Sequence, residues 1–317
     1  MQRMADLPPE RLSAFTRPFH NTGVDCFGPY FIKVGRSSVK RYGCILTCLT
    51  TRAVHLEVLC SLDTNAFINA LCRFISRRGK PDRMFSDNGT NFVGAYRELG
   101  EALKEAQNKK KLRQFLLNQS ISWSFNPPAA SHMGGVWERL IRSCRRVLNA
   151  TVRNVVLTED ELHTVFCQVE AVVNSRPLTK VSDDINDAEV LTPNHFLTPG
   201  GKCAPISVDA CSDDQYRRRW RYVQHLLDRF WKRWLREYLP TIQHRQKWVH
   251  GSPDIRLGDV VLLVDELTHR NQWSLGLVTK VFKGRDDKIR SCQVKTQNSL
   301  LVRPIQKLCL LEACRCP

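Results

Sequence analysis

The chain has 317 residues, of which 42% are hydrophobic and 25% are charged, which excludes a fibrous or intrinsically disordered protein. Its length predicts about two domains, and no apolar run reaches the roughly 18 residues of a membrane-spanning helix, so no membrane association is expected. The formal net charge of +17 favours a polyanionic partner, with nucleic acid as the first candidate.

The cysteine pattern argues against a disulfide framework or a zinc site. The 13 cysteines are odd in number, and no Cys-x-x-Cys pair occurs. Several lie inside apolar patterns and are interpreted as buried free thiols: Cys44, Cys48, Cys72 and Cys167. The first nine residues lack the apolar core of a signal peptide, so we expect the protein in the nucleus and cytoplasm.

The first third of the chain predicts strands followed by a helix. Residues 1–20 are expected to form an irregular leader without the paired His and Cys residues of a zinc module. Three apolar, β-branched runs follow at residues 22–34, 42–49 and 53–59, and their hairpin-like spacing favours antiparallel pairing. Residues 62–76 then change to the spacing of a helix, with apolar side chains recurring every three or four positions.

A short polar stretch follows the fourth predicted strand. That strand spans residues 81–85 and leads into Ser-Asp-Asn-Gly-Thr-Asn-Phe at residues 86–92. Asp87 would then lie at the carboxyl end of a strand, where α/β sheets usually bind ligands. Gly89 suits a sharp turn, and Thr90 suits the N-cap of a following helix. Taken alone, the stretch is equally consistent with an ordinary Asx-turn.

The remaining elements of the first half complete an α/β pattern. A helix is predicted at residues 92–106, and a fifth strand at 120–125 ends at Asn-Pro-Pro. Helices follow at residues 136–152 and 158–174, the second opened by a Thr-x-x-Glu capping box. Residues 21–177 are therefore predicted to form a mixed five-stranded sheet with flanking helices.

The second half changes composition twice. Residues 178–215 are rich in Pro, Gly and Asp and are predicted to connect two domains. Residues 216–250 interleave basic and Trp residues, which suits a helix that binds nucleic acid, or a packed amphipathic helix with a solvated basic face. Residues 251–317 are predicted to form a small all-β barrel or sandwich that binds nucleic acid. Its expected strands span residues 259–264, 273–282, 289–296 and 300–303.

Three acids are candidates for a metal site. Asp25 lies inside an apolar strand, where a carboxylate is costly unless it is paired or binds a cation. Asp87 and Glu138, the latter near the start of a predicted helix, could converge with it. Such a set suits two Mg²⁺ or Mn²⁺ ions about 3.5–4 Å apart, an arrangement used for phosphodiester displacement. Arg142 and Arg145 share a helix face with Glu138 and would meet phosphates, unless that face is simply ion-paired and solvated.

The motifs around these acids resemble a known family. They read Gly-Val-Asp-Cys-Phe-Gly-Pro around Asp25, Phe-Ser-Asp-Asn-Gly-Thr-Asn-Phe around Asp87, and His-Met-Gly-Gly-Val-Trp-Glu-Arg-Leu around Glu138. The chain thereby resembles retroviral-type integrases, and more closely the integrase region of Bel/Pao long-terminal-repeat retrotransposons. Val-Asn-Ser-Arg-Pro-Leu-Thr at 173–179 and Leu-Thr-Pro-Asn-His-Phe-Leu at 191–197 are similar to that group as well.

The resemblance implies a fold, a chemistry and a set of site residues. The implied fold is a ribonuclease-H-like core, followed by a basic helical linker and a small DNA-binding barrel, in a homo-oligomer. The implied reaction trims the 3′ ends of element DNA with water and joins those ends to target DNA. Asp25, Asp87 and Glu138 would be the catalytic residues and would ligate two Mg²⁺ or Mn²⁺ ions. Five residues fall where similar integrases contact DNA: Thr90, Asn91, His132, Arg142 and Arg145.

Two departures from the family pattern keep other functions open. The interval between Asp87 and Glu138 is longer than in retroviral enzymes, so extra residues are expected at 100–119. The N-terminal zinc module is missing, so we expect a fragment whose competence for end joining is open. One alternative is an element-derived DNA-binding protein without catalysis. The other is a ribonuclease H-type nuclease, which needs a Glu that residues 62–76 lack.

Overall fold

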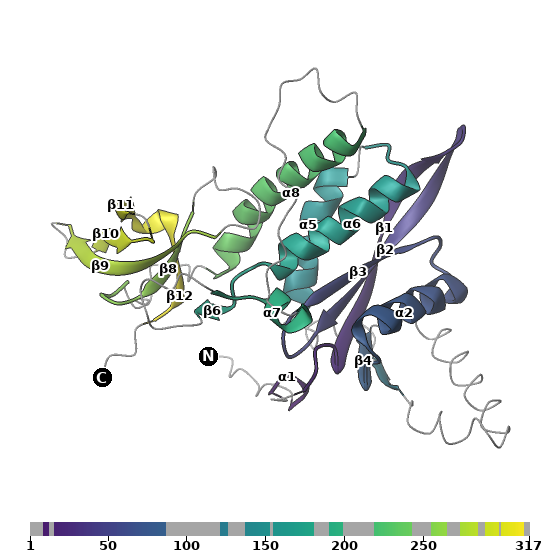
Figure 1. Ribbon diagram of the computed structural model, residues 1–317, viewed down its shortest axis with the longest axis horizontal. Coiled ribbons are helices and arrows are strands. Elements are labelled where there is room, and N and C mark those ends of the chain that lie inside the picture. Colours follow the sequence, from purple (N-terminus) through teal and green to yellow (C-terminus); the bar gives the residue numbers. More distant parts are fainter. Residues whose placement is uncertain are drawn as a thin grey trace, which may run out of the picture. The chain divides into compact units, whose positions relative to one another are not determined.

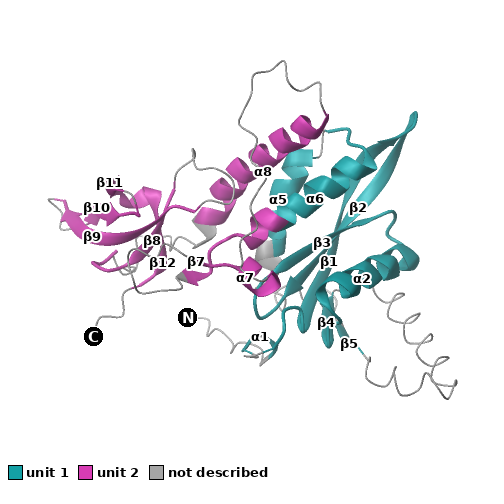
Figure 2. Cartoon of the chain, in the orientation of Figure 1, with its two compact units in different colours: residues 1–170 teal, residues 171–317 magenta. Residues whose placement is uncertain are grey.

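The computed structural model folds the chain into two compact units, residues 1–170 and 171–317 (Figures 1 and 2). It describes residues 9–12, 16–86, 121–125, 137–152, 155–180, 190–198, 219–242, 255–264, 273–284, 289–297 and 299–313. Among the helices in these ranges, none is long and apolar enough to cross a membrane. The domain boundaries expected from the sequence stay a prediction.

A mixed five-stranded sheet forms the first unit, as predicted. Its strands are β1 (Asn21–Val34), β2 (Ser37–Cys48), β3 (Val54–Leu59), β4 (Arg83–Ser86) and β5 (Ser122–Phe125). Their order is β3-β2-β1-β4-β5, with β1, β2 and β3 antiparallel and β4 and β5 parallel to β1. This order and these strand directions fit the predicted ribonuclease-H-like core, and β1 is the middle strand.

The β1–β2 hairpin is longer than the sequence pattern predicted. β2 begins at Ser37 rather than at residue 42. The prediction missed its first residues because they are mostly polar and conceal the strand period. A bulge interrupts the register of β1 between Phe27 and Tyr30. Gly28 has a φ of +128° there, which glycine adopts without strain. The bulge resets the alternation of β1, so that Phe27 and Tyr30 are both buried.

Helices complete the first unit (Figure 1). They are α1 (Pro9–Leu12), a single turn within the predicted irregular leader, α2 (Thr64–Arg78), α5 (Trp137–Val152) and α6 (Glu159–Asn174), whose last residues belong to the second unit. The Asp63 side chain caps α2 by accepting a hydrogen bond from the Ala66 N–H at 2.7 Å. The predicted capping box of α6 is confirmed, because Thr158 and Glu161 exchange side-chain and backbone hydrogen bonds of 2.8 and 3.3 Å. The helix expected at residues 92–106 lies outside the described residues.

The cysteine prediction is confirmed in part. All nine cysteines of the described ranges are free thiols, and Cys44 and Cys48 are buried. Cys72 and Cys167 are exposed, so the prediction that they are buried was wrong. Each lies on a helix beside the apolar stripe rather than within it.

The second unit contains a five-stranded antiparallel sheet. Its strands are β8 (Val260–Leu263), β9 (Leu275–Lys283), β10 (Ile289–Lys295), β11 (Leu300–Pro304) and β12 (Leu308–Glu312), in the order β11-β10-β9-β8-β12. Four strands were predicted and β12 was missed, because Leu-Cys-Leu-Leu shows no alternation of apolar and polar residues. Closure of this sheet into a barrel stays a prediction.

The predicted connecting segment holds some regular structure, and a long helix follows it. β6 (Thr179–Lys180) and β7 (Val190–Leu191) pair antiparallel, and α7 (Pro193–Leu197) comes next. α8 (Arg219–Ile242) buries one face, including Phe230, Trp231 and Trp234. Trp231 and Trp234 therefore pack in the interior, which fits the second of the two interpretations of this segment, a packed amphipathic helix with a solvated basic face.

Candidate active site

The Asp25 carboxylate lies on the middle strand and turns toward α5. Its Oδ2 accepts a hydrogen bond from Arg145 Nη1 at 2.7 Å, and the two charged side chains are 27% and 41% exposed. A pair this accessible to water contributes at most about 1 kcal/mol to stability. Asp25 is thus an accessible carboxylate with a cation beside it, as an acid inside an apolar strand requires.

Further contacts attach α5 to β1 at residues that follow this pair in the sequence. The Arg145 guanidinium lies over the Phe27 ring, 5.9 Å from its centroid. The Tyr30 hydroxyl donates a hydrogen bond of 2.6 Å to Asn149 Oδ1. Burial raises the pKa of Tyr30, so its phenol remains a donor at neutral pH. The helix that begins beside Glu138 is therefore attached to the strand that carries Asp25.

Ser86 ends the strand that leads to the second acid. β4 pairs with β1 in parallel, with Gly23 opposite Phe85. Trp123 Nε1 of β5 donates a hydrogen bond of 2.8 Å to the buried Ser86 Oγ, which links β5 to the end of β4. The structure therefore fixes the chain up to the residue directly before Asp87.

The structure describes some of the predicted site residues and not others. Asp87, Thr90, Asn91 and His132 lie outside the described ranges. The backbone of Glu138 is the second residue of α5, while its side chain is outside the described part. Within the described residues, no group of three or more His, Cys, Asp and Glu side chains could hold a metal ion. Convergence of the three acids therefore stays a prediction.

The two predicted DNA-contacting arginines differ in their surroundings. Arg142 is exposed on α5, whereas Arg145 is held by Asp25. This ion pair was not predicted from the sequence. Its signal was present: an acid in an apolar strand needs a cation, and Arg145 lies two turns after Glu138 on one helix face.

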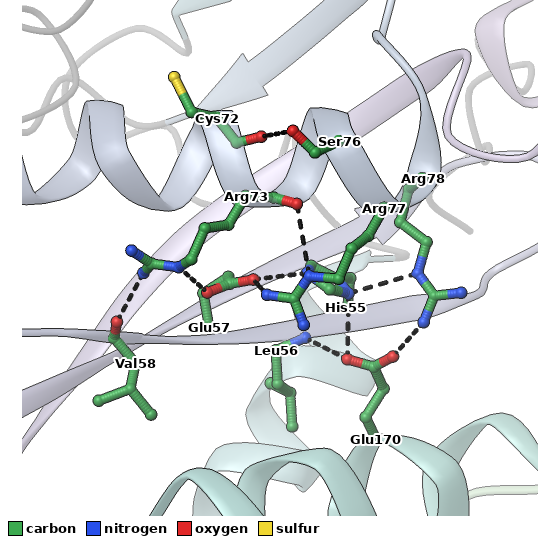
Figure 3. A network of polar contacts seen from close by, with 10 residues as sticks. All are labelled: His55, Leu56, Glu57, Val58, Cys72, Arg73, Ser76, Arg77, Arg78 and Glu170. Atoms are coloured by element: carbon green, nitrogen blue, oxygen red, sulfur yellow. Dashed lines mark hydrogen bonds and ion pairs between the residues drawn. The ribbon is translucent and has the colours of Figure 1, made fainter. Parts of the chain in front are cut away.

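A second polar cluster, which the sequence analysis also missed, lies on β3 (Figure 3). The His55 and Glu57 side chains are each 1% exposed. His55 Nε2 lies 3.0 Å from Glu57 Oε1, and His55 Nδ1 lies 3.1 Å from Glu170 Oε2 of α6. Both ring nitrogens thus lie near a carboxylate, which favours the doubly protonated imidazolium, and Arg78 Nε lies at a longer 3.4 Å from Nδ1.

Three arginines of α2 balance the two carboxylates. Arg73 Nε donates to Glu57 Oε2 at 2.7 Å, and Arg77 also pairs with Glu57. Arg78 pairs with Glu170. The cluster therefore joins β3, α2 and α6 through charge-assisted hydrogen bonds, and Figure 3 shows these residues converging from the three elements.

The same cluster protects the open edge of the sheet. β3 is an outer strand, and outer strands expose unpaired backbone groups. The Leu56 N–H donates to Glu170 Oε2 at 2.8 Å, and the Val58 carbonyl accepts from Arg73 Nη2 at 2.9 Å. Polar residues at alternate positions of an otherwise apolar strand, His55 and Glu57, were the sequence signal for this structural site.

The protonation of this cluster predicts a pH dependence of stability. Burial alone would lower the pKa of His55, but its hydrogen bonds to Glu170 and Glu57 outweigh burial and raise it. Burial alone would raise the pKa of Glu57, but hydrogen bonds from His55 and Arg73 lower it. The stability that protonated His55 contributes is fully present below the pKa of about 6.5 that histidine has in the unfolded state. It is lost as pH rises through the higher pKa of the folded state. The Glu57 contribution is present above about pH 4.3 and is lost as pH falls through the lower folded-state value.

We therefore expect the contribution of this cluster to the free energy of unfolding to be largest between about pH 4.5 and 6.5. It should fall toward pH 9. Urea unfolding of wild type and of His55→Gln across pH 5 to 9 measures this. The variant should lose most stability at pH 5 and should show a flatter decline toward pH 9. Parallel curves for the two proteins would contradict the assignment to His55.

Comparison with known proteins gives a family match for part of the chain and likenesses to solved structures. Residues 218–311, which include α8 and the second sheet, match a family of unknown function (DUF5641). No curated protein matches the chain. The HTLV-2 integrase catalytic core domain, solved with magnesium in a trimeric form, is 14% identical with a TM-score of 0.32, over 57% of this chain and 98% of that one. The simian T-cell lymphotropic virus intasome, in complex with the PP2A regulatory subunit B56 gamma, is 12% identical with a TM-score of 0.32, over 94% and 80%. Both TM-scores are too low for either likeness to support a function for this chain.

Proposed function

We propose that this chain is the integrase of a long-terminal-repeat retrotransposon, with Asp25, Asp87 and Glu138 as the ligands of its catalytic metal ions. The observation that carries the proposal is the Asp25 carboxylate. It lies in the Gly-Val-Asp-Cys-Phe-Gly-Pro motif on the middle strand, is accessible to solvent, and already has a cation beside it.

Covalent geometry and helix geometry support convergence of the three acids. Asp87 is bonded to Ser86, so their Cα atoms are about 3.8 Å apart, and Ser86 ends the strand next to β1. Glu138 precedes Arg145 by two turns of one helix face. Side chains of a helix lean toward its N-terminus, so the Arg145 guanidinium lies closer to the Glu138 end of α5 than its own Cα does. Asp25, which contacts this guanidinium, is therefore also on the Glu138 side of the Arg145 Cα.

The proposed reaction consists of two displacements at phosphorus, a hydrolysis followed by a transesterification. In the first, water attacks phosphorus near the end of element DNA, and the bond to the 3′ oxygen breaks to leave a 3′ hydroxyl. In the second, that hydroxyl attacks phosphorus in target DNA and displaces a 3′ oxygen of the target strand. Each step forms one phosphorus–oxygen bond and breaks one, so no other energy source is needed.

The donor chemistry at Asp25 fits a divalent cation. Hard carboxylate oxygens suit Mg²⁺ or Mn²⁺, and the Arg145 guanidinium shows that positive charge is accommodated at this oxygen. Two such ions, when bound, would stabilise the attacking and leaving oxygens. Arg142, exposed on α5, would bind a DNA phosphate, and the same role is proposed for Thr90, Asn91 and His132.

The exposed face of α8 supports a DNA backbone site in the second unit. Its basic residues recur at helical spacing on the side away from the buried aromatics: Arg229, Lys232, Arg233 and Arg236. Arg233 pairs with Glu237 at 3.0 Å, a solvated i,i+4 pair of small energy. A row of exposed cations of this kind binds phosphates without reading sequence.

We expect the triple variant Arg229→Gln, Lys232→Gln, Arg236→Gln to weaken DNA binding and to reduce its dependence on salt. Each lost phosphate contact lowers the slope of log K against log salt by about 0.9, so three lower it by up to about 2.7. Fluorescence anisotropy with a labelled duplex, measured over a range of salt concentrations, gives the slope. The matched control removes three exposed charges from the β1–β2 hairpin (Lys33→Gln, Arg36→Gln, Lys40→Gln) and should leave it unchanged. Equal slopes for wild type and the α8 variant would exclude this face of α8 as a DNA-binding surface.

Incubation of the protein with Mn²⁺ and a labelled element-end duplex tests the proposed function. We expect shortened 3′ strands and joined products, both abolished by a chelator. Binding without any product would favour the alternative of an element-derived DNA-binding protein. Ribonuclease H chemistry is disfavoured by α2, which contains no acidic residue.

A further inference from the structure

Arg145 pairs with one carboxylate oxygen of Asp25, Oδ2, on the side chain that the proposed function assigns to a metal ion. We infer that Arg145 is a placeholder cation, which neutralises Asp25 in the metal-free protein, leaves when a divalent cation binds, and then contacts a DNA phosphate. The inference rests on the proposed function, because it concerns the same carboxylate. It assigns Arg145 a positioning role at Asp25 in addition to contact with DNA.

Electrostatic repulsion sets the two cations in competition. The guanidinium donates to Oδ2 at 2.7 Å, whereas a Mg²⁺ ion would lie about 2.1 Å from a carboxylate oxygen. With both on this oxygen, the guanidinium nitrogen and the metal ion would lie less than about 5 Å apart, and like charges this close repel. Metal binding at Oδ2 therefore displaces Arg145 from its observed position.

The surroundings of Arg145 allow this displacement. Its side chain is 41% exposed, so the guanidinium can move into solvent without crossing the core. An ion pair exposed to this degree is weak, so the exchange is reversible. The Phe27 ring lies against one face of the guanidinium, a contact of modest energy at an exposed position.

A phosphate is the natural second partner for the released side chain. Arg142 lies one turn before Arg145 on the same helix face and is exposed. Two guanidiniums on neighbouring turns can each bind phosphate oxygens through paired N–H groups. Metal binding at Asp25 and phosphate binding by Arg145 would then favour one another, and such coupling acts equally in both directions.

Metal titrations of the full chain, without any assay of activity, test the inference. Isothermal titration calorimetry with Mg²⁺ would compare wild type, Arg145→Gln and Arg146→Gln, which removes the same charge from an exposed position on the same helix. We expect Arg145→Gln to bind the metal about three- to fivefold more tightly than Arg146→Gln, because the weak pair no longer competes. Repeating the titrations with a short duplex should show that DNA tightens metal binding less in Arg145→Gln than in wild type.

Asp25→Asn separates failure of this inference from failure of the proposed function. If Asp25→Asn abolishes metal binding while Arg145→Gln binds as Arg146→Gln does, or more weakly, the placeholder role is wrong and the metal centre stands. If neither wild type nor Arg145→Gln binds metal, or if Asp25→Asn binds as well as wild type, the metal centre and the placeholder role both fail. Metal binding that appears only in Arg145→Gln would support the inference strongly.

Discussion

Asp25→Asn is expected to abolish trimming and joining of DNA, with a loss of at least about 100-fold, the effect of removing one preorganised charged group from an active site. The amide keeps the shape of the carboxylate but removes its negative charge, and an uncharged oxygen is a poor ligand for Mg²⁺. Rates of 3′ trimming, measured with Mn²⁺ and a labelled duplex, give the loss directly.

Folding and DNA affinity of this variant should remain near those of wild type. The Asp25–Arg145 pair is partly solvated, so its loss should change the free energy of unfolding by less than about 1 kcal/mol. The matched control is Glu159→Gln, which breaks the partly exposed pair of Glu159 with Arg41, 2.9 Å apart, and should leave the rate unchanged. An Asp25→Asn protein that is folded and still trims DNA at the wild-type rate would exclude Asp25 as a catalytic ligand.

Glu57→Ala is expected to lower the free energy of unfolding by about 3 kcal/mol. Removing one partner from a buried charge cluster costs roughly 3–5 kcal/mol, because the remaining charges lose their compensation. The low end applies here, since Arg73 and Arg77 are 42% and 50% exposed and can be hydrated instead. His55, which is 1% exposed, cannot be hydrated in this way. Urea unfolding at pH 6, where the cluster is fully charged, gives the change.

Arg77→Gln serves as the matched control for this prediction. It removes one of two arginines from Glu57, and its own position is half exposed, so the loss should stay below about 1 kcal/mol. Equal losses for Glu57→Ala and Arg77→Gln would show that packing at residue 57, or the arginine alone, accounts for the effect. The cluster would then not be the element that holds α2 and α6 to β3.

The elements of the first unit could be predicted where their period was unbroken. The apolar runs of β1 and β3 and the helical spacing of α2 depend on local sequence, and their bounds differ from expectation by about two residues. The start of β2 at Ser37 could not be found in this way. It is a strand because it pairs with β1, and its polar residues carry no strand signal of their own.

The sequence indicated which residue types form the site, but it did not indicate which side chains contact one another. A carboxylate in the apolar strand around Asp25 indicated a cation, but the sequence could not choose between a metal ion and an arginine 120 positions away. Likewise, the basic and aromatic pattern of α8 was visible, yet only the packing of Trp231 and Trp234 shows which part of it faces inward. Such choices depend on tertiary contacts, which have no fixed sequence spacing.

The central claim is that Asp25, Asp87 and Glu138 hold one metal centre. The most direct measurement is the anomalous diffraction of Mn²⁺ in crystals of the full chain grown with that ion. We predict a peak roughly 2.1 Å from a carboxylate oxygen of Asp25, in contact with Asp87 and Glu138 as well, with Arg145 moved away from Oδ2. A well-ordered Asp25 that keeps its bond to Arg145, with Mn²⁺ bound elsewhere or not at all, would contradict the account.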